Sequence, residues 1–345
     1  MNVRELQMTI SRQRQVDLNS TPYYHCIVRC VRQSFLCGKD TNTGRNFEHR
    51  RGWIVERLKM LSQIFAINIC AYSVMSNHYH VILHVNTAVA TMWSLDEVID
   101  RWCLLFHGGD LVAKRQSQIP LNQDEEEALI LLVEKWRSQL IDISWFMRCM
   151  NEKIARDANA EDECKGRFWE GRFKSQALLD INALLSCMVY VDLNPIRAGI
   201  TNNLEHSDFT SIQERLAAYA QATLDNVNPN ESAHQPKDLV PFSDVLSTDD
   251  ATTLPMTLPS YLSLVDATGR AIRSDKVGYI PDEITSILDQ LNMNPFGFIN
   301  VIKNYTQLFS LASGSPIKLK KFIQQFGGKR IKTLKGCHLL YKKIA

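Results

Sequence analysis

Two histidines separated by a single residue are the first candidates for chemistry in this sequence. His78 and His80 lie in the segment Asn77-His78-Tyr79-His80, whose β-branched and aromatic continuation is typical of a strand. Alternate side chains of a strand share a face, so both imidazoles, with His84 further along, would point the same way and could bind one divalent ion. Two ligands do not make a metal site without a third. A pair of exposed histidines on a half-buried strand is the plainer alternative.

A third ligand can be sought in the helix predicted before Pro195. Ser186, Tyr190 and Asn194 are four residues apart, which places them on one stripe of a helix. Such a stripe usually faces water. Near a metal held by two histidines, however, an asparagine oxygen could complete the coordination of Mg²⁺ or Mn²⁺, and a tyrosine phenol could attack a phosphate that the cation polarises. The residue before a proline is biased away from helical angles, which counts against Asn194.

The elements that must position these residues predict an α+β fold. Three segments have strand composition, residues 23–29, 67–74 and 78–85. A helix between the first two is indicated by apolar residues at helical spacing, from Ile54 to Phe65. The second and third strands are joined by so few residues that they should be antiparallel.

Helices are predicted for most of the remaining chain. Ser94 with Glu97 has the pattern of a capping box, a second helix should begin near Asn122 and extend towards Ile154, and Asp180 can cap a helix that ends near Asn194. Residues from about 224 to 258 are polar with weak periodicity and are interpreted as a linker. The chain after Ser260 is predicted to be helical.

Three segments together resemble the single-tyrosine HUH transposases. VMSNHYHVILHV, residues 74–85, resembles their HUH element, and FWEGRFKSQALLDINALLSCMVYVDLNPIRAGI, residues 168–200, resembles their tyrosine helix. YHCIVR, residues 24–29, resembles the first strand of that domain. Within this group the chain resembles the REP-associated tyrosine transposases and similar insertion-sequence transposases, and the resemblance covers roughly residues 20–200.

The resemblance implies a ferredoxin-like antiparallel sheet with packed helices and a metal-dependent transposase activity on DNA. The enzyme would be a single-stranded DNA endonuclease and strand transferase that acts on hairpin or repeat DNA through a 5′-phosphotyrosine intermediate. Carried over by position, Tyr190 is the nucleophile, and His78, His80 and Asn194 hold Mg²⁺ or Mn²⁺. Tyr79 should pack into the sheet. Both a monomer and a homodimer are left open.

DNA binding requires basic and stacking side chains, and the sequence supplies both. A basic and aromatic run precedes the tyrosine helix. Trp169 as a stacking platform competes with the commoner role of a core aromatic. From Pro316 to the end there are nine Lys or Arg and no Asp or Glu, a tail that either binds phosphates or is a solvated helix surface. The candidate DNA contacts are Arg29, Arg167, Arg172, Lys174, Arg197 and Trp169.

The predicted domain organisation follows from the extent of the resemblance. Residues 1–222 would form the nuclease domain, 223–258 a linker, and 259–345 a small basic helical domain of unknown role. The interval between His80 and Tyr190 is longer than in compact relatives, which indicates a helical insertion at about 104–154.

Composition indicates a globular protein of the cytoplasm. A hydrophobic fraction of 45% with 22% charged residues excludes a disordered or low-complexity chain, and the net charge of +2 is small. The sequence lacks an apolar run of about 18 residues and a signal-like N-terminus, so we expect no membrane association. We expect the protein to associate with the nucleoid only when it is bound to DNA. Nine scattered cysteines without CxxC pairs favour free thiols over disulfides or structural zinc.

Two other functions stay open at this level. The first is a domesticated protein that binds nucleic-acid hairpins without cutting them, against which the intact histidines and tyrosine count mildly. The second is a ferredoxin-like RNA-binding module, for which an RNP-type aromatic signature is lacking.

Overall fold

The fold is built around a five-stranded sheet. The computed structural model describes residues 15–31, 36–38, 44–243, 253–272, 282–325 and 334–342. The strands are β1 (Tyr23–Arg29), β2 (Ile67–Val74), β3 (His78–Val85), β4 (Lys174–Leu178) and β5 (Ala312–Ser313), in the order β2-β3-β1-β4-β5. The fold is therefore α+β, and the first three strands have the predicted bounds.

The sheet contains the expected antiparallel strands and one parallel edge strand in addition, so it is mixed. β1 pairs antiparallel with β3 and with β4, and β2 pairs antiparallel with β3, whereas β5 runs parallel to β4. The reason is that β5 comes from a distant part of the chain and occupies the edge of β4 that the ferredoxin-like succession of strands and helices leaves unpaired. Strand pairing thus joins the C-terminal helices to the same sheet that carries the histidines.

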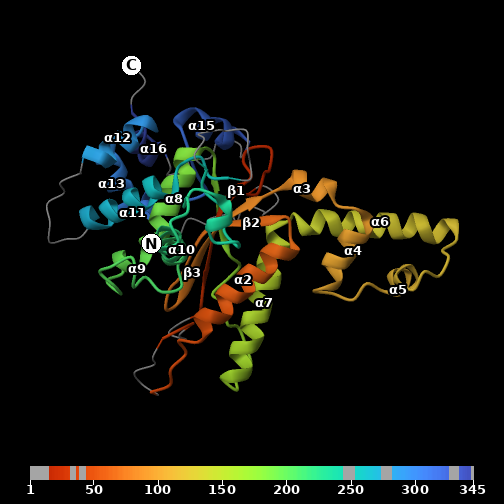
Figure 1. Ribbon diagram of the computed structural model, residues 1–345. Coiled ribbons are helices and arrows are strands. Elements are labelled where there is room, and N and C mark those ends of the chain that lie inside the picture. The colour runs from red at the N-terminus through yellow and green to blue at the C-terminus, as the bar shows by residue number, and fades with distance from the viewer. Residues whose placement is uncertain are drawn as a thin grey trace, which may run out of the picture.

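Helices cover both faces of the sheet (Figure 1). α2 (Arg50–Ile64) and α7 (Ile143–Glu161) pack together on one face, and α8 (Ile181–Asp192) lies on the other. The alternation of β3 decides which side chain meets which layer. Tyr79 is buried on the α7 side, where its hydroxyl donates to Asn151 Oδ1 at 2.8 Å, while His80 faces α8. The predicted burial of Tyr79 is confirmed.

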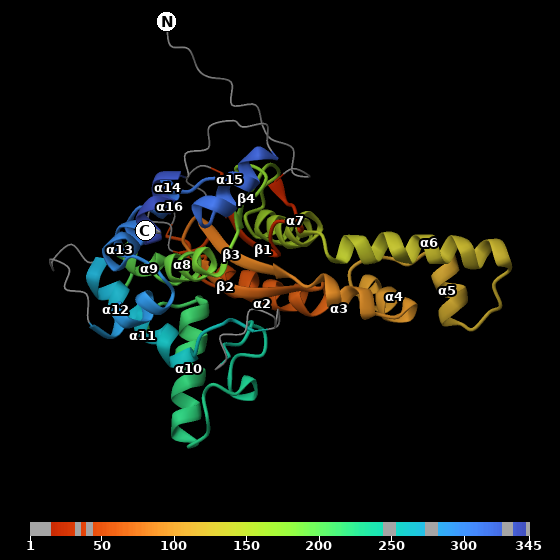
Figure 2. The ribbon, with the colours of Figure 1, turned by 90° about the horizontal axis from the view of Figure 1, so that it is seen from above.

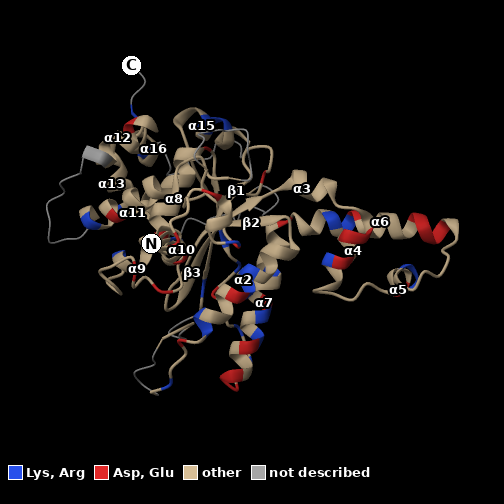
Figure 3. Cartoon of the chain, viewed as in Figure 1, with Lys and Arg blue, Asp and Glu red and all other residues tan. Residues whose placement is uncertain are grey.

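An arm of four helices projects from the body (Figures 1 and 2). It consists of α3 (Thr87–Met92), α4 (Leu95–Cys103), α5 (Asp110–Gln116) and α6 (Gln123–Leu140). Trp102 and Trp136 stack at 5.1 Å and join α4 to α6. Three acidic residues of α6 lie in its first turn, at the far end of the arm (Figure 3).

The predicted capping box at Ser94 and the predicted helix start near Asn122 are confirmed, and one predicted helix is wrong in length. The side chains of Ser94 and Asn122 each accept a hydrogen bond from the backbone N–H of the third helical residue, Glu97 or Glu125. In return, the carboxylate of that Glu accepts from the backbone N–H of Ser94 or Asn122. The helix from Asn122 does not continue towards Ile154, because Asp142 interrupts it and caps the new helix α7 through Ser144 N.

The C-terminal helices pack against α8 and share one hydrophobic core with the sheet. They are α11 (Leu258–Ile272), α12 (Asp282–Gln290), α13 (Pro295–Lys303), α14 (Tyr305–Leu308), α15 (Pro316–Gln324) and α16 (Leu334–Leu340). α11 and α13 contact α8 directly.

Short elements link the body to these helices. α9 (Asn194–Arg197) follows α8, and α10 (Ser211–Leu224) leads to a segment with a 3-10 turn, Ser232–His234. Part of this segment packs on the sheet, because Leu239 bridges to Ile69 and the buried Arg215 donates to Val240 O. The predicted boundaries at 222 and 258 stay predictions. Across the described ranges, every helix is too short or too polar to cross a bilayer.

Candidate active site

β3 brings the two histidines to a cavity that Tyr190 of α8 also lines. In the register of β1 and β3, Ile27 pairs with His80 and Arg29 with His78, so all four side chains lie on the α8 face. The cavity measures about 570 Å³. It is lined by Ile27, Arg29, His78, His80, Glu170, Gly171, Arg172, Lys174, Tyr190 and Thr306.

His80 is the more deeply buried of the two histidines. Its Nδ1 lies 2.9 Å from His25 Nε2, and its own Nε2 is buried with no hydrogen-bond partner among the described residues. Burial makes the largest contribution to lowering the pKa of His80 well below its usual value, and the nearby His25 and His78 lower it further. The ring is therefore neutral at pH 7, which is the form that binds metals.

His78 is half-buried and more exposed than His80. Its Nδ1 is 2.6 Å from Asn77 Oδ1, and its ring centroid is 5.0 Å from that of His80. Burial, with a contribution from the Arg29 charge, lowers the pKa of His78 to about 4. The structure thus brings both predicted ligands together in their neutral form.

Tyr190 reaches the same cavity from α8. The helix begins as predicted, since Asp180 accepts a hydrogen bond from Ala183 N. The Tyr190 ring meets the His80 ring edge-on, with 5.7 Å between centroids. Burial raises the pKa of Tyr190, while the Arg197 guanidinium, 4.6 Å from the ring centroid, acts in the opposite direction. The phenol is neutral at rest and lies beside a cation.

Asn194 is buried but does not line the cavity. α8 ends at Asp192, and Asn194 is the first residue of the short helix α9; Pro195 has no N–H to continue the hydrogen bonds of α8 but is tolerated in the first turn of a new helix. Its Oδ1 accepts a hydrogen bond from Arg197 Nη1 at 3.1 Å. The guanidinium places a positive charge beside the amide oxygen that was predicted to bind a cation.

The rest of the predicted stripe is also buried, because α8 lies between the sheet and the C-terminal helices. Ser186 donates to Asn182 O at 2.6 Å within the helix. His84, on the same face of β3, stacks on Tyr23 at 4.7 Å and does not line the cavity.

Three of the predicted DNA contacts line the cavity and three do not. Arg29, Arg172 and Lys174 belong to the lining. Arg197 contacts Tyr190 instead. Trp169 is buried on the opposite face, where its Nε1 donates to Asn151 O at 2.9 Å, and Arg167 Nε donates to Trp169 O at 2.9 Å. Trp169 thus has the packing of a core aromatic.

Four residues near the site were not among the predicted ones. His25, next to His80, carried a weak signal, because it alternates with Ile27 and Arg29 on β1. Glu170 was within the quoted motif without an assigned role. Tyr305 and Thr306 come from α14, far along the chain, and no local pattern indicates them.

The donor set suits a divalent ion in part. Within the described ranges, no three His, Cys, Asp or Glu side chains are grouped to hold a metal. His78 and His80 fit as a pair, because His80 Nε2 is a buried nitrogen without a partner. Further ligands would have to come from substrate or solvent, since the Asn194 amide is bonded to Arg197.

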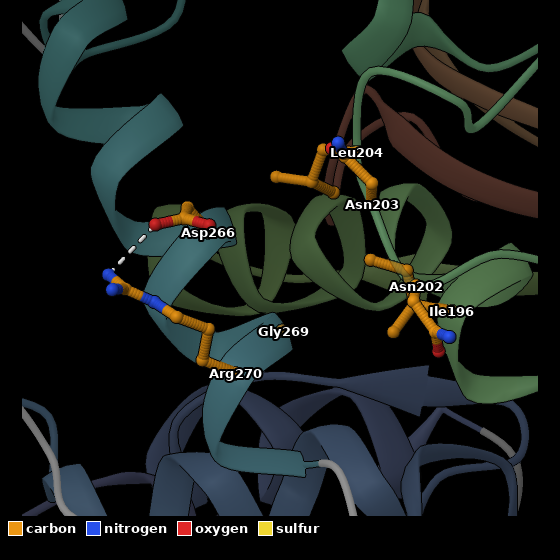
Figure 4. Close-up of a pocket in the computed structure, with 7 residues that line it drawn as sticks. All are labelled: Ile196, Asn202, Asn203, Leu204, Asp266, Gly269 and Arg270. Atoms are coloured by element: carbon orange, nitrogen blue, oxygen red, sulfur yellow. Dashed lines mark ion pairs between the residues drawn. The ribbon is translucent and has the colours of Figure 1, made fainter.

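A second hollow of about 310 Å³ lies between α11 and the loop after α9 (Figure 4). The two charged residues that line it, Asp266 and Arg270, form an ion pair with each other at 2.8 Å. It adds no group to the candidate site. Its lining consists of Ile196, Asn202, Asn203, Leu204, Asp266, Gly269 and Arg270.

Comparison with known proteins gives one distant structural likeness. No family model and no curated protein matches the sequence. Among solved structures, this chain is similar to that of a REP-associated tyrosine transposase bound to a REP hairpin. The TM-score is 0.33 and the sequence identity 12%, over 57% of this chain and 79% of that chain. Similarity at this level does not establish a shared function.

Proposed function

We propose that this protein is a transposase-type enzyme, a divalent-metal-dependent endonuclease and strand transferase for single-stranded or hairpin DNA. One observation carries the proposal. Tyr190, His78 and His80 line a single cavity together with Arg29, Arg172 and Lys174. A nucleophile, a pair of metal-binding nitrogens and phosphate-binding cations are the groups that phosphoryl transfer to tyrosine needs.

The basic residues would bind the DNA backbone beside the nucleophile. Arg29 on β1 and Lys174 on β4 lie on the same face as the histidines, and Arg172 precedes β4. Three cations against the single carboxylate of Glu170 give the lining a positive balance that favours an anionic backbone. Binding should therefore weaken as salt rises.

His78 and His80 would hold the cation. A divalent ion bound there would supply positive charge to the phosphoryl oxygens. Arg29 and Arg172 orient the phosphate by hydrogen bonds from their guanidinium groups. Tyr190 is only 4% exposed, so bulk water has little access to its side chain.

The reaction exchanges one phosphate ester for another. The Tyr190 oxygen attacks phosphorus, an O–P bond to tyrosine forms, and the P–O3′ bond breaks. The phenol loses its proton and the departing 3′ oxygen gains one, so a 3′-hydroxyl and a 5′-phosphotyrosine result without an energy cofactor. Attack by another 3′-hydroxyl reverses the step and joins strands.

The test is a covalent-adduct assay on hairpin DNA from the flanks of the gene. The DNA is labelled at its 3′ end, because that fragment stays on the tyrosine, and is incubated with Mg²⁺ or Mn²⁺ or with EDTA before a denaturing gel. Wild type should give a metal-dependent protein–DNA band that Tyr190→Phe lacks. Tyr219→Phe, a change on α10 away from the cavity, should keep the band.

Two outcomes would change the assignment. A Tyr190→Phe protein that cuts at the wild-type rate excludes this nucleophile. DNA that is retarded on a native gel without any covalent band, in both metals and several hairpins, indicates the alternative function of a non-cleaving hairpin-binding protein.

A further inference from the structure

We infer that the C-terminal helices complete the active site by holding Tyr190, with Tyr305 as the main positioning residue. The inference rests on the proposed function for its kinetic consequence. Its structural basis is a contact between α14 and α8, two helices that are distant along the chain.

Tyr305 stacks on the proposed nucleophile. The two rings are nearly parallel, with 4.6 Å between centroids and an interplanar angle of 19°. Tyr305 is only 1% exposed, and its neighbour Thr306 lines the cavity. A tyrosine ring that lies in a cavity can rotate about two side-chain bonds, and a parallel ring against it restricts that rotation.

A second contact from the same region fixes the cation beside Tyr190. Arg197 Nη2 donates to the backbone oxygen of Lys303 at 2.9 Å, and Nη1 donates to Asn194 Oδ1 at 3.1 Å. The guanidinium is thereby held with its carbon 4.6 Å from the Tyr190 centroid. The Lys303 contact uses the backbone, so the side chain at this position is free to vary.

Further hydrogen bonds tie the start of α8 to the C-terminal helices. Asn182 Nδ2 donates to Leu291 O at 2.8 Å, and Lys318 Nζ donates to Leu179 O at 3.1 Å. Asp180, which caps α8, also accepts from Ser315 N at 2.6 Å. The helix that carries the nucleophile is therefore anchored from the C-terminal side at its beginning and at its reactive end.

The test replaces Tyr305 by leucine and by phenylalanine in the full chain. Leucine fills much of the buried space without an aromatic face, and phenylalanine keeps the stack. Single-turnover adduct formation should slow about tenfold in Tyr305→Leu with DNA affinity unchanged, since an aromatic pair contributes about a 2- to 12-fold effect. Tyr305→Phe, which keeps the stacked ring, should form the adduct at nearly the wild-type rate.

A measurement without DNA separates this inference from the proposed function. In protein labelled with ¹³C-tyrosine, the Tyr190 ring signals are identified by their loss in Tyr190→Phe. Tyr305→Leu should move and broaden them, while Tyr305→Phe should leave them nearly in place. Unmoved Tyr190 signals in Tyr305→Leu overturn the inference, as does an equal loss of rate in the leucine and phenylalanine variants.

A chain of hydrogen bonds supports a second inference, that His25 sets the tautomer of His80. Gln176 Nε2 donates to Ser310 O at 3.5 Å, so its Oε1 faces His25 Nδ1 at 3.4 Å. An amide oxygen only accepts, so His25 Nδ1 carries the proton and His25 Nε2 accepts from His80 Nδ1–H. His80 Nε2 is left with a free lone pair at the cavity.

Removing the His25 acceptor should weaken metal binding without touching a ligand. In His25→Leu the His80 proton is free to occupy Nε2, and Mn²⁺ affinity should fall about 10- to 100-fold, the usual effect of losing such a partner. His25→Gln returns an acceptor oxygen and should recover part of the affinity. Calorimetry with Mn²⁺ alone measures both.

The tautomer itself can be observed in the metal-free protein. Ring ¹⁵N shifts should show a protonated Nδ1 and an unprotonated Nε2 for His80, identified by comparison with His80→Gln. A protonated Nε2, or an unchanged Mn²⁺ affinity in His25→Leu, would contradict the inference. Neither readout depends on DNA cleavage.

Discussion

Replacing His84 by phenylalanine should change how stability depends on pH. His84 is 1% exposed on the α8 face of β3 and stacks on Tyr23 at 4.7 Å. Phenylalanine keeps a flat ring at this place and removes the titratable group. Burial lowers the pKa of His84 to about 4, so the native ring resists protonation while the unfolded chain does not.

The magnitude follows from the two pKa values of His84. The unfolded value is about 6.5, and the difference of about 2.5 pH units is equivalent to roughly 3 kcal/mol. Because the unfolded state binds the extra proton, stability falls as pH drops from about 6.5 to about 4. Between pH 7 and pH 5 the loss from this residue is about 2 kcal/mol.

Urea unfolding of both proteins at pH 7 and pH 5 measures this effect. The free energy of unfolding of wild type relative to His84→Phe should fall by about 2 kcal/mol between the two pH values, with equal m-values. The other buried histidines are common to both proteins and drop out of the comparison. A stability difference that is the same at both pH values would refute the assigned pKa and its cause.

Three further predictions concern charge and packing. Burial raises the pKa of Asp192 to about 6, so the native state binds a proton that the unfolded chain releases. Wild type should therefore gain roughly 1 kcal/mol of stability from pH 7 to pH 5 in urea titrations, and Asp192→Asn should remove that gain. Lys174→Gln should reduce the magnitude of the negative slope of log K, the DNA association constant, against log salt concentration by about 1, measured by fluorescence anisotropy. A Cβ on Gly297 would lie 1.8 Å from Leu339 O, so Gly297→Ala should cost about 3 kcal/mol, whereas Gly52→Ala, in open space on α2, should gain about 0.5–1 kcal/mol in the same unfolding experiment.

The sequence predicted those parts of the site whose geometry is local. The period of a strand places His78 and His80 on one face, and the structure has β3 with the predicted bounds. The period of a helix places Tyr190 on α8, and the cap at Asp180 fixes where that helix begins. Each of these inferences needs only the residues on either side.

Local periodicity misled where a break in the backbone intervened. Asn194 is four residues after Tyr190, but α8 ends at Asp192 and Asn194 begins α9, because Pro195 has no N–H to continue the hydrogen bonds of α8. The Asn194 amide oxygen then accepts from Arg197. In the same way, a single helix from Asn122 was expected where Asp142 starts a new one. Both breaks occur at a residue that ends or caps a helix, which a count of helical spacing does not take into account.

Contacts between distant segments could not be predicted from periodicity at all. β5 has only two residues, so it has no pattern to recognise, and its parallel pairing with β4 depends on the packing of the helices around it. The stack of Tyr305 on Tyr190 depends on the same packing. These are the parts of the fold in which tertiary contacts, not local preference, decide the structure.

The same distant contacts determine how the C-terminal region can be tested. A chain that stops at residue 258 would lose β5 and expose the edge of β4, and it would lose the helices that bury the outer side of α8. The Arg197 contact with Lys303 and the Tyr305 stack would be lost together with a large part of the core. Loss of cleavage in such a truncation would follow from unfolding as readily as from chemistry. Point variants that keep most of the buried volume, such as Tyr305→Leu beside Tyr305→Phe, separate the two, because they change one side chain and leave β5 paired with β4.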